Sequence, residues 1–74
     1  MRYPVVFEKS LDGSYSAYPP DLPGCGIIGK SLEEARKLIA EAIEMHLAGL
    51  REDGLAIPTP SIVLTELVEV HDAA

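Results

Sequence analysis

Nucleophilic chemistry in this chain could come only from one thiol and two imidazoles, those of Cys25, His46 and His71. A catalytic cysteine needs a histidine within hydrogen-bond reach, so that the imidazole can take up the thiol proton. The sequence places neither histidine beside Cys25, and the three residues lack the spacing of a zinc site. We therefore predict a small cysteine that is packed or partly exposed, no catalytic residue, no metal site and no cofactor.

Metal-assisted hydrolysis would need carboxylates from different elements to meet around a metal pair. The chain carries 12 acidic residues, but the middle of its first predicted strand, residues 5–7, supplies none. Glu8, Asp21 and Glu66 are the acids that a degenerate metal-dependent nuclease would have to bring together. Because they belong to a strand end, a loop and another strand, their spacing does not predict that they converge. We expect the acidic side chains to be solvated.

The elements that position these residues follow the order β-β-β-α-β. The first two predicted strands are joined by Asp12-Gly13, a pair typical of a hairpin because glycine accepts a positive φ. Residues 20–25 then form a stiff loop, since their prolines suit neither a helix interior nor a central strand. The first three strands are expected to form an antiparallel meander. The predicted strands are residues 2–9, 14–18, 26–29 and 62–70.

A single long helix is predicted to begin at Ser31 and to stop at Gly54. Ser31 and Glu34 have the spacing of a capping box, in which each side chain satisfies a backbone N–H at the helix start. A helix that joins the third strand to the last makes a right-handed crossover, so these two strands should pair in parallel. Apolar residues recur at steps of three and four, which places them on one face. They are Leu32, Ala35, Leu38, Ile39, Ala42, Ile43, Leu47 and Leu50.

The last predicted strand is apolar on both faces, which indicates burial on both sides of the sheet. One helix covers only one face, so we expect a second copy of the chain to cover part of the sheet. Oligomerisation also suits a chain of 74 residues that cannot form an internal disulfide, because its core alone is marginal. We predict a homo-oligomer, a dimer or a tetramer, whose interface includes Val63, Leu67, Val68 and Val70.

The formal net charge of −6 makes the chain a poor partner for phosphates, since nucleic-acid binding requires a basic patch. An acidic surface could instead attract a basic protein. No apolar run reaches the ~20 residues that a membrane-spanning helix needs, and the N-terminus lacks the pattern of a signal peptide. We expect a cytoplasmic protein without a membrane partner.

Four segments match a known family in their order and spacing. They are the tyrosine-bearing strand at 15–18, the Pro-Asp-Leu-Pro-Gly-Cys loop at 20–25, the helix start Ser-Leu-Glu-Glu-Ala at 31–35, and residues 52–54 with 57–61. Together they closely resemble the HicB-type antitoxin domain. The resemblance implies an α+β fold, a truncated ribonuclease H-like arrangement with a four-stranded mixed sheet, one helix on one face, and the last strand beside the first. Residues 1–74 would form a single HicB-like antitoxin domain.

The resemblance also implies a function. HicB-type domains bind a small basic ribonuclease toxin and cover its catalytic histidine and RNA surface. This chain is therefore expected to be a non-enzymatic antitoxin of a type II toxin-antitoxin system, which neutralises a HicA-like toxin by occlusion. Charge and position make five residues candidates for the contact with the toxin: Asp21, Glu33, Glu34, Glu41 and Glu44.

Many members of the family add a C-terminal DNA-binding module that represses their own operon. Because this chain ends shortly after its last predicted strand, we expect no such module and no direct DNA binding. Two alternatives to the antitoxin stay open. One is a degenerate ribonuclease H-like nuclease, and the other is a small oligomeric scaffold without a toxin partner.

Overall fold

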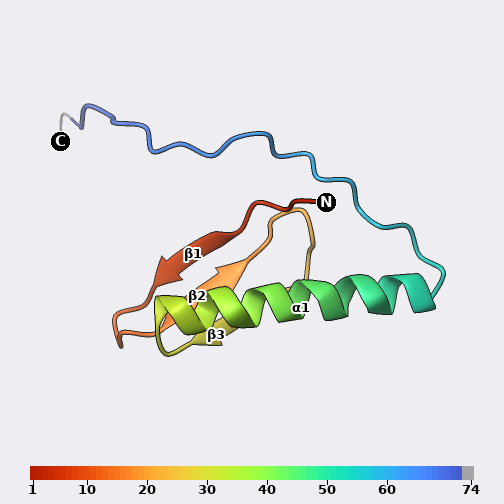
Figure 1. Cartoon of the computed structure of the whole chain (residues 1–74). Coiled ribbons are helices and arrows are strands. Elements are labelled where there is room, and N and C mark those ends of the chain that lie inside the picture. The colour runs from red at the N-terminus through yellow and green to blue at the C-terminus, as the bar shows by residue number, and fades with distance from the viewer. Residues whose placement is uncertain (73–74) are drawn as a thin grey trace.

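The computed structural model describes residues 1–72, which form a small antiparallel sheet and one long helix (Figure 1). The strands are β1 (Val6–Lys9), β2 (Tyr15–Tyr18) and β3 (Ile27–Gly29), and the helix is α1 (Leu32–Glu52). The strand order is β1-β2-β3, and both neighbouring pairs are antiparallel. The predicted α+β class and the antiparallel meander are confirmed. Residues 73–74 of the predicted domain lie outside the described part.

A tight turn after β1 returns the chain into β2. The Gly13 N–H donates to the Ser10 carbonyl over 3.0 Å, and Gly13 takes a φ of +89°, which residues with a side chain rarely adopt. The Asp12 carboxylate accepts from the N–H and the hydroxyl of Ser14, at 2.9 and 2.7 Å. These bonds close the turn from which β2 runs back along β1, and they confirm the predicted hairpin.

The loop between β2 and β3 is shaped by its prolines and by one glycine. The Cys25 N–H donates to the Leu22 carbonyl over 3.2 Å, with Pro23 and Gly24 between them and Gly24 at a φ of +85°. A proline followed by a positive-φ glycine is the pattern of a type II turn. The Leu22 N–H donates to the Pro19 carbonyl over 3.0 Å, and the Leu22 side chain is only 1% exposed. The loop is therefore held by its own turns and by one leucine in the core.

The start of α1 is capped by side chains on both sides of the first turn. The Glu34 N–H donates to the Ser31 hydroxyl over 3.1 Å, and the Glu34 carboxylate accepts from the Lys30 N–H over 2.9 Å. In a standard capping box the return bond comes from the N-cap residue itself. The cap predicted for Ser31 is confirmed, but its return bond comes from Lys30, one residue earlier.

The end of α1 follows the pattern of a Schellman motif. Gly54 takes a φ of +68°, and its N–H donates to the Arg51 carbonyl over 3.1 Å. The Leu55 N–H donates to the Leu50 carbonyl over 2.9 Å. This pair of bonds satisfies carbonyls that the helix leaves free, and it turns the chain out of the helix at the predicted glycine.

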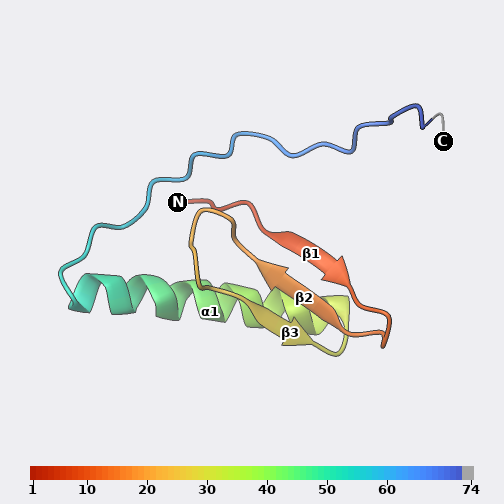
Figure 2. The ribbon, with the colours of Figure 1, turned by 180° about the vertical axis from the view of Figure 1, so that it is seen from behind.

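One face of the sheet is covered by α1, which packs over β2 and β3 (Figures 1 and 2). The buried core joins Ala17 of β2, Ile39 of α1, and Leu22 and Cys25 of the loop between β2 and β3. The helix contributes the stripe of apolar positions that its spacing predicted, with three further residues packed against this core: Ala42, Ile43 and Leu47.

Residues 62–70 are extended, but the prediction that they form a fourth strand is wrong for this structure. Beyond α1 the chain runs back on the side of β1 and stays apart from the sheet (Figures 1 and 2). In the described part the sheet has three strands and no parallel pair, so the structure does not support the predicted four-stranded, ribonuclease H-like arrangement. Alternating apolar residues favour an extended backbone, but a strand also needs a neighbour for its hydrogen bonds.

The strands begin later than predicted. β1 begins at Val6 rather than at residue 2, because Pro4 has no N–H to donate to a strand neighbour. The hydroxyl of Tyr3 instead donates to the carbonyl of Pro58, which ties the segment before β1 to the chain after α1. β2 and β3 each begin one residue after the predicted position.

Candidate functional site

Asp21 in the loop after β2 holds the chain that follows α1. The Ser61 hydroxyl donates to Asp21 Oδ1 over 2.7 Å, and the Ser61 N–H donates to Oδ2 over 3.2 Å. The Ile62 N–H lies 3.5 Å from the same Oδ2. With the bond from Tyr3 to Pro58, these contacts anchor residues 58–62 to the body of the protein. Asp21 was predicted as a partner contact, and its carboxylate is engaged within the chain.

Acidification is expected to release this anchor. The Ser61 hydroxyl and, more weakly, the N–H groups of Ser61 and Ile62 lower the pKa of Asp21 from its usual 3.8. A carboxylate with a lowered pKa in the folded state stabilises the protein above its unfolded pKa, and this contribution is lost as the pH falls through the lowered value. NMR should therefore show the Ser61 and Ile62 amides shifting together as the pH falls, with a midpoint below the usual 3.8.

The variant Asp21→Ala is the control for this titration, because it should give the released amide shifts at neutral pH. Amide shifts of Ser61 that stay unchanged in Asp21→Ala would show that the anchor does not exist in solution. The Asp12 carboxyl offers an internal reference, since the N–H and hydroxyl of Ser14 lower its pKa in the hairpin. Its titration should be read at Ser14 and should persist in Asp21→Ala.

The exposed face of α1 carries three of the predicted partner-binding residues, Glu33, Glu41 and Glu44. Steps of eight and three residues place them on the same side of a helix. Lys37 lies between Glu33 and Glu41, so the face is mixed, although α1 contains five acidic and three basic residues. Glu34 is also exposed, but its carboxylate caps the helix start. The geometry leaves Glu33, Glu41 and Glu44 as the acids of α1 best placed to meet a partner.

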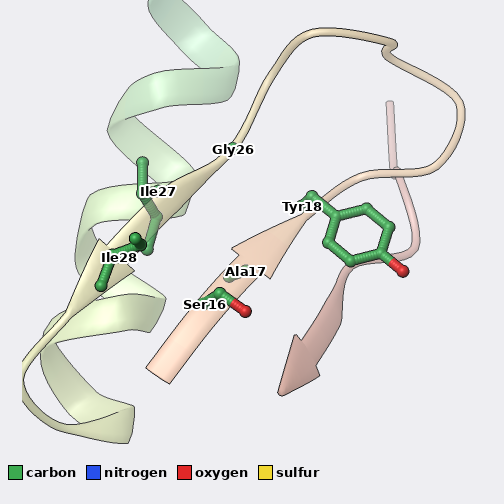
Figure 3. Close-up of a pocket in the computed structure, with 6 residues that line it drawn as sticks. All are labelled: Ser16, Ala17, Tyr18, Gly26, Ile27 and Ile28. Carbon is green, nitrogen blue, oxygen red and sulfur yellow. The ribbon is translucent and has the colours of Figure 1, made fainter. Parts of the chain in front are cut away.

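A shallow apolar depression lies between β2 and β3 (Figure 3). Ser16 pairs with Ile28 across these strands, and Tyr18 shares the face of Ser16, opposite to the buried Ala17. Tyr18 and Ile28 are 39% and 73% exposed, so this face of the sheet presents large apolar side chains to solvent. The sequence did not predict this depression, whose lining is Ser16, Ala17, Tyr18, Gly26, Ile27 and Ile28.

Cys25 and His46 line a second depression, where the loop after β2 meets α1. Their spacing along the chain did not predict this, because the contact joins a loop to a helix. The Cys25 side chain is buried, and desolvation raises the pKa of its thiol. A nucleophilic cysteine needs the opposite shift. Of the packed and partly exposed positions predicted for Cys25, the structure shows the packed one, and it gives no support for a Cys–His catalytic pair.

The residues predicted for an oligomer interface all lie on the extended segment beyond the anchor. Within a single chain, Val63, Leu67, Val68 and Val70 are between 74% and 104% exposed. Leu64 of the same segment was not predicted at the interface and is 67% exposed. The segment thus presents a continuous set of apolar side chains to solvent.

Among residues 1–72, no group of three or more His, Cys, Asp or Glu side chains could hold a metal ion. Glu8, Asp21 and Glu66, the acids of the nuclease alternative, therefore do not form such a group, and Asp21 is bonded to Ser61. The arrangement gives that alternative no support. The helix of the described region does not have the length and apolar character needed to cross a membrane.

Comparison with known protein families matches residues 3–72 to one family, described as the HicB_like antitoxin of bacterial toxin-antitoxin system. The match spans nearly the whole chain. This chain therefore belongs to the HicB-like antitoxin family, and the resemblance seen in its loop and helix motifs is confirmed.

Relatives from bacteria and archaea support this membership. A UPF0150 protein of Synechocystis is 38% identical over 66 residues, which cover 89% of this chain and 84% of the relative. A UPF0150 protein of Thermoplasma acidophilum is 37% identical over 71 residues, covering 96% and 99%. Antitoxin HicB 1 of Photorhabdus laumondii is 34% identical over 70 residues, covering 95% of this chain but 45% of that protein. The chain spans about half the length of this named antitoxin.

Proposed function

We propose that this chain is a cytoplasmic antitoxin that binds a small basic ribonuclease of the HicA type and blocks it by covering its RNA surface, without catalysis of its own. The observation that carries the proposal is the family match over residues 3–72. The net charge of −6 supports it, because an acidic protein attracts a basic one in solution and orients the encounter.

The exposed face of α1 is the surface on which we propose that the toxin binds. Glu33, Glu41 and Glu44 share this face, and a helix capped at both ends presents them on a rigid support. Asp21 and Glu34 use their carboxylates to bond the anchor and the helix start. Their part in binding would be to hold α1 and its surroundings in shape.

Removing the three acids of this face is expected to weaken toxin binding. The triple variant Glu33→Gln, Glu41→Gln, Glu44→Gln should lose about tenfold in affinity or more, which equals about 1.4 kcal/mol. The loss should shrink at high salt, because charge pairs at the rim of an interface are screened. Calorimetric titration with the HicA-type toxin at two salt concentrations measures both effects.

A second triple variant separates the local surface from the overall charge. This control changes the net charge by the same amount as the first triple variant, but at exposed residues away from α1: Glu8→Gln, Glu66→Gln and Glu69→Gln. Equal losses in the two variants would show that net charge, and not the face of α1, drives binding. Failure of this chain to form a complex with the product of the adjacent gene, and to rescue growth when the two are co-expressed, would refute the antitoxin role.

A further inference from the structure

One flank of α1 carries an exposed apolar side chain beside the acids proposed to meet the toxin. Met45 is 76% exposed, whereas the other large apolar residues of α1 are buried or half-buried. It lies four positions after Glu41 and directly after Glu44, and residues four apart are neighbours on the surface of a helix. Met45 therefore borders the exposed face of α1, and little of its side chain is used in packing the helix against the sheet.

The depression between the loop after β2 and the helix opens next to Met45. Its lining comes from both elements: Gly24, Cys25 and Gly26 of the loop, and Ala42, Met45 and His46 of α1. Two glycines and an alanine leave this space unfilled, and a Cβ on Gly24 would meet nothing within 4 Å. We call it the loop–helix depression. The chain thus offers a protruding methionine and a hollow beside it.

Both walls of the loop–helix depression are held in place by the fold. The Cys25 N–H bonds the Leu22 carbonyl, and the Leu22 side chain is buried in the core, so the loop is fixed where it meets α1. The helix is capped at both ends. A preformed surface binds a partner without the entropy cost of ordering a loop.

The surface around Met45 has the composition of a protein interface. Such interfaces combine an apolar centre, in which methionine is enriched, with a polar rim. Met45 and the loop–helix depression supply the apolar centre, and Glu41 and Glu44 supply a rim that continues into the exposed face of α1. Methionine is also unbranched, so it can adapt its shape to a partner.

The depression on the sheet has no such continuity with the acids of α1. Ser16 and Ile28 pair across β2 and β3 on the face opposite to Ala17, which packs against Ile39 of the helix (Figure 3). That depression therefore opens on the side of the sheet that α1 does not cover. Of the two depressions, the one beside Met45 is the one that a partner bound to the exposed face of α1 would reach.

Charge selects the kind of side chain that fits beside Met45. Residues 41–49 contain two acids and no lysine or arginine. Lysine and arginine side chains lay their apolar stems along apolar surface while the charged head stays at the edge. A basic side chain could rest its stem on Met45 and turn its charge toward Glu41 and Glu44, whereas an acidic one would meet like charge.

We propose that the toxin contact extends from the exposed face of α1 across Met45 into the loop–helix depression. There a lysine or arginine of the toxin lies with its stem on Met45 and its charge toward Glu41 and Glu44. Met45 is then the apolar anchor of the interface, and the acids set its preference for a basic partner. The inference rests on the proposed antitoxin function, because the toxin is the partner that it places.

Truncation of the anchor tests this contact. Met45→Ala should lose about tenfold in affinity for the HicA-type toxin in calorimetric titration, as truncation of a central interface residue does. This loss should stay nearly the same at low and high salt, unlike that of the triple acid variant, because ions do not screen an apolar contact. Met45→Leu, which keeps an apolar side chain of similar volume, should bind nearly as well as the unchanged chain.

Leu11→Ala is the matched control, since it truncates a side chain that is 110% exposed in the turn between β1 and β2. It should bind the toxin as the unchanged chain does. Unchanged binding by Met45→Ala, or an equal loss in Leu11→Ala, would overturn this contact and leave the antitoxin role standing. An unchanged chain that forms no complex with the toxin would refute the antitoxin role itself, and this contact with it.

NMR of the complex locates the contact directly. On addition of the toxin, the methyl signal of Met45 and the amide signal of Gly24 should shift, while the signals of Tyr18 and Ile28 should stay in place. Shifts at Tyr18 and Ile28 without shifts at Met45 and Gly24 would place the toxin on the open face of the sheet, and would overturn the proposal. Circular dichroism of Met45→Ala should match that of the unchanged chain, because the side chain is mostly exposed.

Discussion

Leu22→Ala is expected to lower the free energy of unfolding by about 2–5 kcal/mol, the usual range for a buried leucine. The Leu22 side chain is 1% exposed and joins the loop after β2 to the core beneath α1. A domain of this size buries only about 60% of the surface of its unfolded chain, so little stability remains to absorb the loss. Urea unfolding followed by circular dichroism should show the midpoint falling sharply or the folded baseline disappearing.

Leu11→Ala is the matched control, because it makes the same chemical change at a side chain that is 110% exposed. Its effect should stay within about 0.5 kcal/mol. Where Leu22→Ala leaves no folded protein to measure, Leu22→Met should remain folded and cost less than about 1.5 kcal/mol, since it nearly conserves the volume. Equal midpoints for the two alanine variants would show that Leu22 does not hold the loop.

Gly29→Ala is expected to cost about 1–3 kcal/mol, as overpacking of a closely packed site does. A Cβ on Gly29 would lie 2.9 Å from the backbone N of Ala35 and 3.1 Å from its Cα. These atoms belong to the first turns of α1, so the helix itself would have to move away from β3. The same urea titration measures the loss.

Gly49→Ala should shift the stability in the opposite direction. A Cβ on Gly49 would meet nothing within 4 Å, and the residue lies inside α1, where alanine is favoured over glycine by about 0.5–1 kcal/mol.

Ala35→Gly should not rescue Gly29→Ala, because the two atoms nearest to a Cβ on Gly29 are backbone atoms of Ala35. Rescue by Ala35→Gly would show that the contact is between side chains.

Local signals in the sequence predicted most of the regular structure. The hairpin at Gly13, the turn at Gly24 and the helix end at Gly54 each place a glycine at a positive φ. The apolar spacing of α1 predicted which face meets the sheet, and Ser31 predicted where the helix begins. These features depend on residues a few positions apart, so a short stretch of chain carries all the information needed.

The candidate site depended on contacts between distant residues, and here the sequence predicted less. Asp21 was chosen for its charge as a partner contact, yet it bonds Ser61, which lies 40 residues away. Cys25 and His46 share a depression that joins a loop to a helix. The family membership, however, was readable from the loop and helix motifs, and the comparisons confirm it.

Residues 62–70 show both what the local sequence determines and what only tertiary contacts decide. Their alternating apolar residues determine an extended backbone with both faces suited to burial, and the chain is extended there. Whether such a backbone becomes a strand is decided by tertiary structure, because every strand needs the hydrogen-bonding edge of another. Turns, caps and the apolar face of α1 are local and follow from residue order. A strand neighbour for the last segment is not local, and in the described residues that segment runs on the side of β1, apart from the sheet and unpaired with any strand.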